Sequence, residues 1–367
     1  MGGVKYDKYF SKPPKSITFK KLKRQFTFLF ILLIHQAANC QSEFDSLFVN
    51  SPRESINKIK IEFDDDYGNK TFLPLTVIKG KDQGIVFTIL AGVHGAEYAP
   101  IIATQKLIKK LELNKLTGTI IILPITNIGA FYSSTPYVNP IDNLNINRIF
   151  PGNENGSVSE KIAHFIATKI IPVSDFFLDA HSGDANEDLL PFVCYYDNKN
   201  YPFQTKMAKE LSEYSGFENV ISYPYTIKKH EPALYAFKQA TQVGKIALSF
   251  ESGKLGYLQP KAVDRILRGY YRIFDKLKMY EYNDPLGETK FKRLNSPYYI
   301  KSKFQGILYS KYRAGEKVLK NRELGFITDE FGKIIERYFA TKSGTILYMK
   351  GTPPVNIGDT VFSISPN

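Results

Sequence analysis

The sequence predicts an α/β fold with a mixed, mostly parallel sheet flanked by helices, followed by a smaller all-β domain at the C-terminus. From residue 85 to about residue 278, short apolar strand-like segments alternate with longer helical segments, a pattern typical of βαβ units. After residue 283 this alternation stops, and the last eighty or so residues are β-rich. A length of 367 residues with 43% hydrophobic content suffices for a sizeable core and about two domains.

The first forty residues predict a secretory signal peptide. Basic residues from Lys20 to Arg24 precede the apolar run 26–34, and the small-residue stretch 37–40 follows it. As a helix this run is only about 14 Å long, too short for a stable transmembrane segment. We therefore expect export, to the periplasm or out of the cell. Anchoring as a lipoprotein acylated at Cys40 is the alternative, which Asn39 fits poorly.

The net charge of +13 does not indicate a nucleic-acid partner. Residues 1–40 hold eight Lys/Arg and one Asp, so they supply +7 and leave +6 for the remainder. No basic stripe is interleaved with aromatic residues, and no glycine-rich phosphate loop occurs. Beyond the leader only Cys194 remains, so no internal disulfide is expected, and we interpret Cys194 as a small buried residue.

The elements are expected in the following order. A polar segment, 41–57, leads into two alternating strands at a sheet edge, 58–63 and 72–78. The central βαβ pattern then comprises strand 85–91, helix 96–111, strand 119–124, helix 159–171, strand 175–178, helix 203–214, strand 245–250 and helix 260–278. These elements predict one domain from 58 to 280. The β-rich domain, 285–367, contains a weak repeat that begins with Gly306-Ile-Leu-Tyr and again with Gly344-Thr-Ile-Leu-Tyr, and so predicts a small sandwich or barrel.

Two histidines follow predicted strands. His94 lies after strand 85–91 with Glu97 three residues on, and His181 lies just past strand 175–178. Because the carboxyl ends of parallel strands meet at one edge of a sheet, these three side chains are expected to converge. Two imidazoles and a carboxylate form the ligand set of a catalytic zinc site. We expect Gly92 and Gly95 to permit a sharp turn, with His94 and Glu97 on one side of a starting helix.

Four motifs in order resemble the succinylglutamate desuccinylase/aspartoacylase family, relatives of the zinc carboxypeptidases. They are "GVHGAE", "NLNINRIFPG", "DAHSG" and "FESG", and the similarity covers about residues 80–275. The resemblance implies a zinc carboxypeptidase-like fold with His94, Glu97 and His181 as zinc ligands. It also implies that Asp179 orients a ligand imidazole.

The resemblance further implies that Asn147 and Arg148 bind a substrate carboxylate and that Glu251 transfers the catalytic proton. From the residues alone, Arg148 could instead pair with Asp142, Asn147 could cap a turn, and Glu251 could be a structural acceptor. His164 and His230 are not expected to be ligands. Family members commonly carry an additional arginine before the NxNR stretch, whereas the run 131–143 contains no basic residue.

These observations predict a zinc-dependent hydrolase that removes an acyl group, at an amide bond, from a small carboxylate-bearing substrate such as an N-acyl amino acid. A zinc carboxypeptidase acting on peptides or cell-wall fragments is the alternative enzyme. An inactive binding protein of the same fold is the alternative from another class. The acyl group, the amino acid and the oligomeric state do not follow from the sequence.

Overall fold

The computed structural model describes residues 43–282 and 290–367, so the predicted signal peptide and Cys40 lie outside the described residues. Residues 43–46 are helical and do not belong to the compact unit Leu47–Asn367, which contains all the elements named below. Among the described residues, no helix is both long and apolar enough to span a bilayer.

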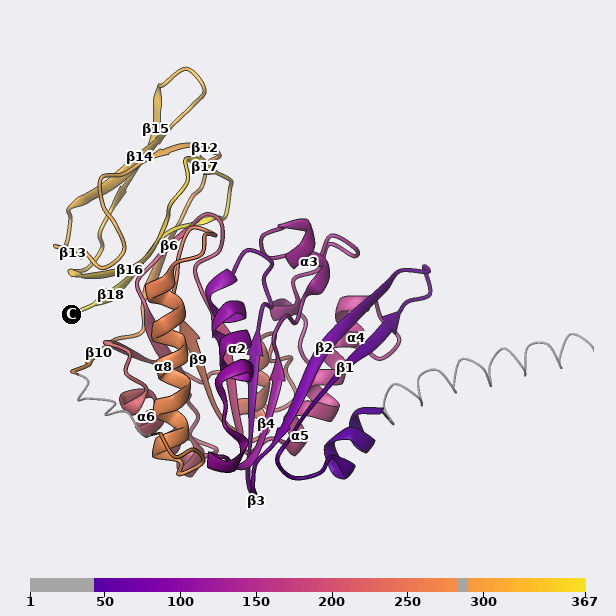
Figure 1. The fold of residues 1–367 in the computed structure, drawn as a ribbon. Coiled ribbons are helices and arrows are strands. Elements are labelled where there is room, and N and C mark those ends of the chain that lie inside the picture. Colours follow the sequence, from indigo (N-terminus) through magenta and orange to yellow (C-terminus); the bar gives the residue numbers. More distant parts are fainter. Residues whose placement is uncertain (1–42, 283–289) are drawn as a thin grey trace, which may run out of the picture. The chain divides into compact units, whose positions relative to one another are not determined.

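A nine-stranded mixed sheet is the centre of the larger part, in the order β1-β2-β4-β3-β5-β9-β7-β8-β10 (Figure 1). Its strands are β1 (Ser55–Asp64), β2 (Lys70–Lys79), β3 (Asp82–Ala91), β4 (Thr117–Leu123), β5 (Phe176–His181), β7 (Phe192–Asp197), β8 (Asn219–Pro224), β9 (Ile246–Glu251) and β10 (Lys292–Leu294). Five of the eight strand pairs are parallel, while β1–β2, β2–β4 and β7–β9 are antiparallel. This confirms the predicted mixed, mostly parallel sheet.

Helices cover both faces of this sheet. They are α2 (Tyr98–Lys110), α3 (Ile128–Ser133), α4 (Val158–Phe165), α5 (Ile171–Val173), α6 (Pro202–Tyr214), α7 (Ala236–Gln242) and α8 (Pro260–Lys276), with short turns η1 (Leu113–Lys115), η2 (Ile146–Arg148) and η3 (Ile166–Ile170). Helices α2, α6 and α8 pack on one face with the main core. On β3, Phe87 points into that core, whereas Thr88 hydrogen-bonds Ser174, which follows α5. Alternation along the strand therefore places α5 on the opposite face.

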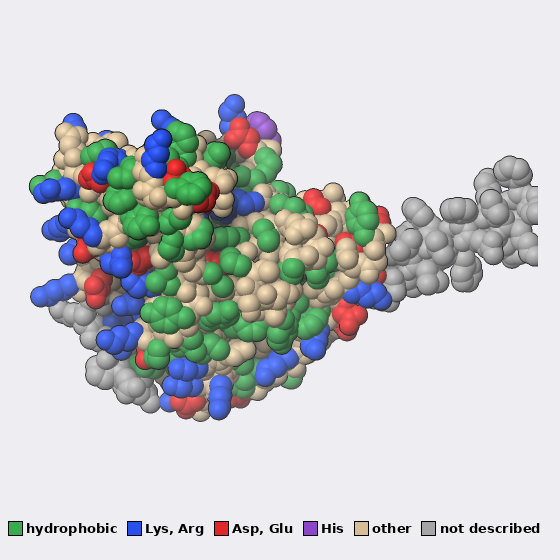
Figure 2. All heavy atoms as spheres, turned by 90° about the horizontal axis from the view of Figure 1, so that it is seen from above, with side chains coloured by type: hydrophobic (Ala, Val, Ile, Leu, Met, Phe, Trp, Pro, Cys, Tyr) green, Lys and Arg blue, Asp and Glu red, His purple; other side chains and the backbone are tan. Residues whose placement is uncertain are grey.

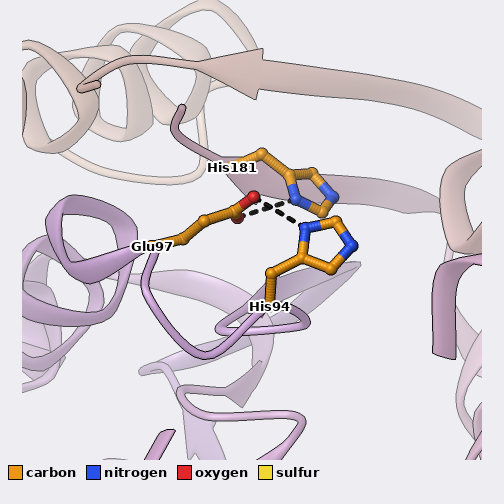
Figure 3. A group of neighbouring side chains, drawn as sticks. All are labelled: His94, Glu97 and His181. Atoms are coloured by element: carbon orange, nitrogen blue, oxygen red, sulfur yellow. Dashed lines mark hydrogen bonds and ion pairs between the residues drawn. The ribbon is translucent and has the colours of Figure 1, made fainter. Parts of the chain in front are cut away.

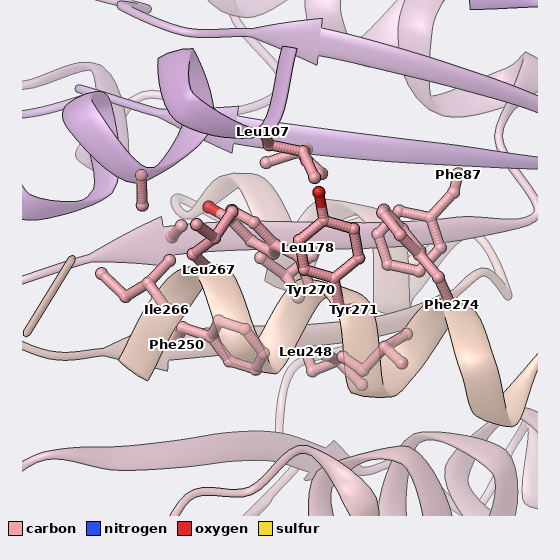
Figure 4. Close-up of a cluster of buried hydrophobic side chains, with 14 of the residues drawn as sticks. Phe87, Leu107, Leu178, Leu248, Phe250, Ile266, Leu267, Tyr270, Tyr271 and Phe274 are labelled. Carbon is pink, nitrogen blue, oxygen red and sulfur yellow. The ribbon is translucent and has the colours of Figure 1, made fainter. Parts of the chain in front are cut away.

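The main core lies between α8 and the parallel strands (Figure 4). Tyr270 and Phe274 of α8 are buried, and Phe274 meets Phe87 edge-on at 5.2 Å between ring centroids. Phe250 on β9 stacks on Tyr270 at 5.9 Å. Burial of such aromatic side chains contributes on the order of 2 to 3 kcal/mol each. This packing fixes the position of β9 beside β5, and both strands end at the candidate site.

The C-terminal part is all-β, as predicted. Its strands are β11 (Tyr298–Lys301), β12 (Gly306–Tyr309), β13 (Lys317–Val318), β14 (Glu323–Thr328), β15 (Ile334–Phe339), β16 (Gly344–Lys350), β17 (Pro354–Val355) and β18 (Thr360–Pro366). They form two antiparallel sheets, β11-β18-β16-β13 and β15-β14-β12-β17. The two copies of the repeat begin with β12 and β16, which belong to different sheets.

The two parts of the chain exchange strands. A short strand from the larger part, β6 (Glu187–Leu189), pairs with β16, while β10 adds a parallel strand to the large sheet. Because β6 follows His181 by only six residues, the all-β part is held next to the end of β5. On the face seen in Figure 2, most Lys and Arg side chains lie toward the left and lower edges, where acidic and hydrophobic side chains separate them.

Candidate metal centre and active site

The segment between β3 and α2 presents His94 and Glu97. Gly92 has a φ of +64°, a conformation that glycine adopts without steric cost, and it turns the chain sharply after Ala91. Helix α2 begins only at Tyr98, so Glu97 is its N-cap and His94 lies in the preceding loop. The expectation that both residues lie on one side of a starting helix is therefore wrong, and the loop brings them together instead.

His181 and Glu251 come from neighbouring parallel strands. His181 is the last residue of β5, rather than lying beyond the strand, and Glu251 is the last residue of β9. The two are register partners in the β5–β9 pair. Their side chains therefore project from the same face of the sheet and are neighbours.

His94, Glu97 and His181 form a compact cluster (Figure 3). The Nδ1 atom of His94 lies 2.7 Å from Oε1 of Glu97, and Nδ1 of His181 lies 2.9 Å from Oε2 of the same carboxylate. One possible ligand atom from each residue lies within 4.8 Å of the other two. The structure thus brings together the three residues that the sequence predicted as ligands. His164 and His230 are not part of this cluster.

Charges in the cluster are strongly coupled. Glu97 is 2% exposed and His181 is 5% exposed. Burial alone would raise the pKa of the Glu97 carboxyl group, but His181 and His94 outweigh it and lower that pKa to about 2. Burial opposes charging of His181, yet Asp179 and Glu97 raise its pKa well above the ordinary value. The buried Glu97 carboxylate thus stabilises positive charge on both imidazoles. A divalent metal ion would bind here in place of the imidazole protons.

The donor set fits zinc. Two imidazole nitrogens and one carboxylate oxygen match the His₂Glu sets of catalytic zinc sites, which leave a coordination position open. Magnesium and calcium prefer sites built from oxygen ligands alone. His94, Glu97 and His181 are therefore the described residues that would hold the metal.

Two side chains contact the far nitrogen of His181. Oδ1 of Asp179 lies 2.9 Å from Nε2 of His181, and Nδ2 of Asn147 lies 3.2 Å from the same atom. Asp179 is completely buried, and neither of its carboxylate oxygens has a hydrogen bond of ordinary geometry among the described residues, so the contact with His181 is an ion-pair contact. A carboxylate in this position would accept the Nε2 proton and leave Nδ1 free for a metal.

Asn147 and Arg148 lie in η2, next to this cluster. Oδ1 of Asn147 accepts a hydrogen bond from the backbone N–H of Ala236, and Nη1 of Arg148 donates to the carbonyl of Asn147 at 2.7 Å. Asp142 accepts hydrogen bonds from Ser159 instead of pairing with Arg148. The Arg148 guanidinium lies 4.7 Å from the centroid of the Tyr235 ring.

Glu251 lies beside several other acidic groups. Burial raises the pKa of its carboxyl group well above the usual range; His181 opposes this effect, and the negative charges of Glu97 and Glu187 add to it. Burial likewise raises the pKa values of Asp184 and Glu187 to about 6 each. These shifts favour the protonated form of Glu251, whereas Asp184 and Glu187 take up protons only as the pH falls to about 6.

Sequence reasoning missed Tyr137, Asp184 and Glu187. The Tyr137 ring meets the His94 ring edge-on at 5.7 Å between centroids, and its backbone N–H donates to Asp184. Its hydroxyl group donates to Oδ1 of Asn186. Tyr137 belongs to the run 131–143, which contains no basic residue, and its ring contacts His94 of the cluster. Its φ of +58° is uncommon for a bulky residue and marks a constrained turn.

The chain is similar in sequence to known proteins. The succinylglutamate desuccinylase/aspartoacylase catalytic domain matches residues 83–277. The Nα-acetyl-L-2,4-diaminobutyric acid deacetylase of Halomonas elongata is 28% identical over 315 residues, which are 84% of this chain and 90% of that protein.

Solved structures show the same fold. The succinylglutamate desuccinylase/aspartoacylase of Rhodobacter sphaeroides superposes with a TM-score of 0.75 at 22% identity, over 86% of this chain and 97% of that one. The product-bound ectoine utilization protein EutE (DoeB) of Ruegeria pomeroyi superposes with a TM-score of 0.76 at 22% identity, over 87% of this chain and 98% of that one.

Proposed function

The chain belongs to the succinylglutamate desuccinylase/aspartoacylase family, and we propose that it is a zinc-dependent deacylase that hydrolyses the amide bond of an N-acyl amino acid with a free carboxylate. The observation that carries the proposal is the buried His94–Glu97–His181 cluster with Glu251 at the end of the adjacent strand. Export of the protein, proposed from the sequence of residues 1–40, would place this activity outside the cytoplasm.

His94, Glu97 and His181 would hold the zinc ion. Bound zinc would supply Lewis acidity, which polarises the scissile carbonyl and makes a water molecule a stronger nucleophile. Asp179 would keep the His181 ring in the orientation that directs Nδ1 at the metal. The negative charges of the buried Glu97 and Asp179 carboxylates would then balance the two positive charges of the ion.

Glu251 would move the proton. As a carboxylate it would take a proton from the attacking water, and as the acid it would give that proton to the leaving nitrogen, so that an amide and water become a carboxylic acid and an amine. Its raised pKa in the absence of metal shows how strongly its surroundings favour the protonated form. A nearby divalent cation would lower this pKa toward neutrality, where a group can both accept and donate a proton.

Arg148 would bind the substrate carboxylate. No ion-pair partner for its guanidinium occurs within 43–282 or 290–367, and Tyr235 and the Asn147 carbonyl orient it. A planar guanidinium can bind a carboxylate with two parallel hydrogen bonds. Asn147, whose amide contacts both His181 and Ala236, would hold this arginine at a fixed place relative to the metal.

The experiment compares Glu251→Gln with wild type and with Glu330→Gln, a substitution on the surface of the all-β part. Purified wild type is expected to contain about one zinc per chain and to release free amine from N-acyl amino acids. Glu251→Gln should retain zinc but lose about 10²- to 10⁴-fold in kcat, whereas Glu330→Gln should match wild type. Full turnover by Glu251→Gln would remove this residue from the mechanism, and absence of zinc with full activity would refute the metal site. Zinc binding without any hydrolysis would indicate the inactive binding protein.

A further inference from the structure

Strand β1 forms a long edge of the nine-stranded sheet (Figure 1). Within residues 43–282 and 290–367 it pairs with β2 alone, over the 10 residues Ser55–Asp64. The strand at the opposite edge, β10, has only 3 residues. An edge strand presents a row of backbone N–H and C=O groups that can pair with a strand of another chain. In the large sheet, β1 is the edge with the length for such pairing.

Alternate residues of β1 direct their backbone groups away from β2. The backbone N–H of Asp65 donates to the carbonyl of Asn69 at 3.1 Å, just beyond the paired residues of β1 and β2. Because hydrogen-bonded pairs alternate along an antiparallel ladder, β1 bonds to β2 through its odd-numbered residues. The carbonyl of Asp64 accepts a hydrogen bond from Nζ of Lys161 at 2.6 Å, which agrees with an outward direction for the even-numbered residues.

The even-numbered residues also carry charges in a self-complementary order. The side chains of Lys58, Lys60, Glu62 and Asp64 are exposed on one face of β1, so the charges along the strand are positive, positive, negative and negative. Nζ of Lys60 lies 4.6 Å from the centroid of the Phe72 ring on β2, which keeps the ammonium group on this face. If a second copy of β1 pairs in the antiparallel direction, each positive charge can lie opposite a negative one. In a parallel pair in register, each charge would lie beside its own kind.

One antiparallel register pairs all four charges. It sets Ile61 opposite Ile61 of the second copy, so that Lys60 lies opposite Glu62 and Lys58 lies opposite Asp64, each pair occurring twice. This register also places even-numbered residues opposite even-numbered ones, as a ladder between the two open edges requires. A register centred on Lys60 would oppose two ammonium groups. Opposite charges directly across a pair of strands are stabilising and like charges are destabilising.

The other face of β1 adds apolar contacts in the same register. Ile61 is completely buried, and the ring of Phe63 meets that of Phe165 on α4 edge-on at 5.8 Å between centroids. Ile59 and Phe63 are only half-buried. The register sets Ile59 of one copy opposite Phe63 of the other. Pairing would therefore cover apolar surface that a single chain leaves partly in water.

We propose that the protein forms a two-fold symmetric dimer in which the β1 strands of two copies pair antiparallel about Ile61 and join the two large sheets into one. The interface is isologous, because the same strand provides both sides. Strands β2, β4 and β3 lie between β1 and β5, which carries His181, so pairing leaves the metal cluster of each copy unchanged. The dimer does not depend on the proposed deacylase function.

The test uses two charge reversals that are unfavourable in a homodimer and complementary in a heterodimer. Sedimentation equilibrium measures the dissociation constant of the dimer for wild type, for Lys60→Glu, for Glu62→Lys and for an equimolar mixture of the two variants. In each single variant two attractive pairs become repulsive, so the dissociation constant should rise roughly tenfold or more. In the mixture every introduced charge lies opposite an unlike charge, so a heterodimer should form about as tightly as the wild-type dimer.

The double variant Lys60→Glu/Glu62→Lys should also dimerise like wild type, because it exchanges the two charges within each chain. Lys333→Glu is the matched control, since it makes the same charge change at an exposed position of the all-β part and should leave dimerisation unchanged.

Three results would overturn the proposal. They are a wild type that is monomeric at every measurable concentration, single variants that dimerise as tightly as wild type, and weakened single variants for which neither the mixture nor the double variant recovers. The sedimentation readout involves no hydrolysis, so failure of the dimer and failure of the deacylase function are separate results.

Discussion

Replacement of Gly95 by alanine should weaken zinc binding by a steric clash alone. A Cβ atom at Gly95 would lie 2.4 Å from the carbonyl oxygens of Ala130 and Thr135. Unlike Gly92, Gly95 does not have a positive φ, so the added methyl group would clash without any strain of backbone conformation. The Ala130 oxygen also accepts a hydrogen bond from the backbone of Thr135 and cannot withdraw freely. The loop that carries His94 and Glu97 must move instead.

The size of this movement sets the expected loss. Real Cβ atoms essentially never approach within 3.0 Å, so the loop must shift by about 0.6 Å (3.0 minus 2.4). Metal–ligand distances tolerate only about ±0.2 Å. We expect a loss of zinc affinity of about 10- to 100-fold, the range found when groups supporting the ligands are removed. The overpacking itself should lower the free energy of unfolding of the metal-free protein by about 1 to 3 kcal/mol.

The assay titrates zinc against a chromophoric chelator and measures urea unfolding of the metal-free protein. Gly332→Ala is the control, because Gly332 has a φ of +84° with nothing within 4 Å of an added Cβ. That variant should lose about 1 kcal/mol of stability and bind zinc as wild type does. Wild-type zinc affinity in Gly95→Ala would refute the reasoning that this close approach positions the ligands.

Two further predictions concern stability. The Asp188 carboxylate is 2% exposed and pairs with Nζ of Lys254 at 2.7 Å, so Lys254→Met leaves it without its cation. Because the lysine side chain is 36% exposed, the free energy of unfolding in urea should fall by about 1 to 3 kcal/mol. An unchanged urea midpoint would contradict this prediction. In the metal-free protein, the lowered pKa of Glu97, about 2, stabilises the fold above its unfolded value of about 4.3 and is lost as the pH falls toward 2. The raised pKa of His181 stabilises the fold below about pH 6.5 and is lost as the pH rises through the folded value. The melting temperature of the metal-free protein should therefore decline as the pH rises. Zinc requires neutral imidazole, so this decline should be absent in the zinc-loaded protein. If the melting temperature depends on pH in the same way with and without zinc, the cluster is not the zinc site.

The parts of the fold that could be predicted from sequence are those with a local signal. Strands β3, β4, β5 and β9 are apolar runs bounded by polar residues, and α8 has a strongly amphipathic pattern. The sequence patterns do not predict strands β7 and β8 or helices α3 and α7. Strand β7 lies antiparallel beside β9, and helix α7 is only seven residues long. Their formation depends on contacts with the rest of the sheet, which no short sequence window contains.

The same distinction between local sequence signals and long-range contacts explains which residues of the site could be predicted. His94 and His181 follow strands whose order could be inferred, so their convergence was predictable from the rule that parallel strands end at one edge. Tyr137 and Glu187 carry no such signal, because one lies in an irregular turn and the other in an acidic segment that resembles a solvated loop. The pairing of β6 with β16 places Glu187 opposite Lys350 in the β6–β16 ladder. Burial raises the pKa of Tyr348 on β16, and the nearby charge of Glu187 raises it further. Burial there turns an ordinary glutamate into a group with a raised pKa, and only the assembled sheets determine that burial.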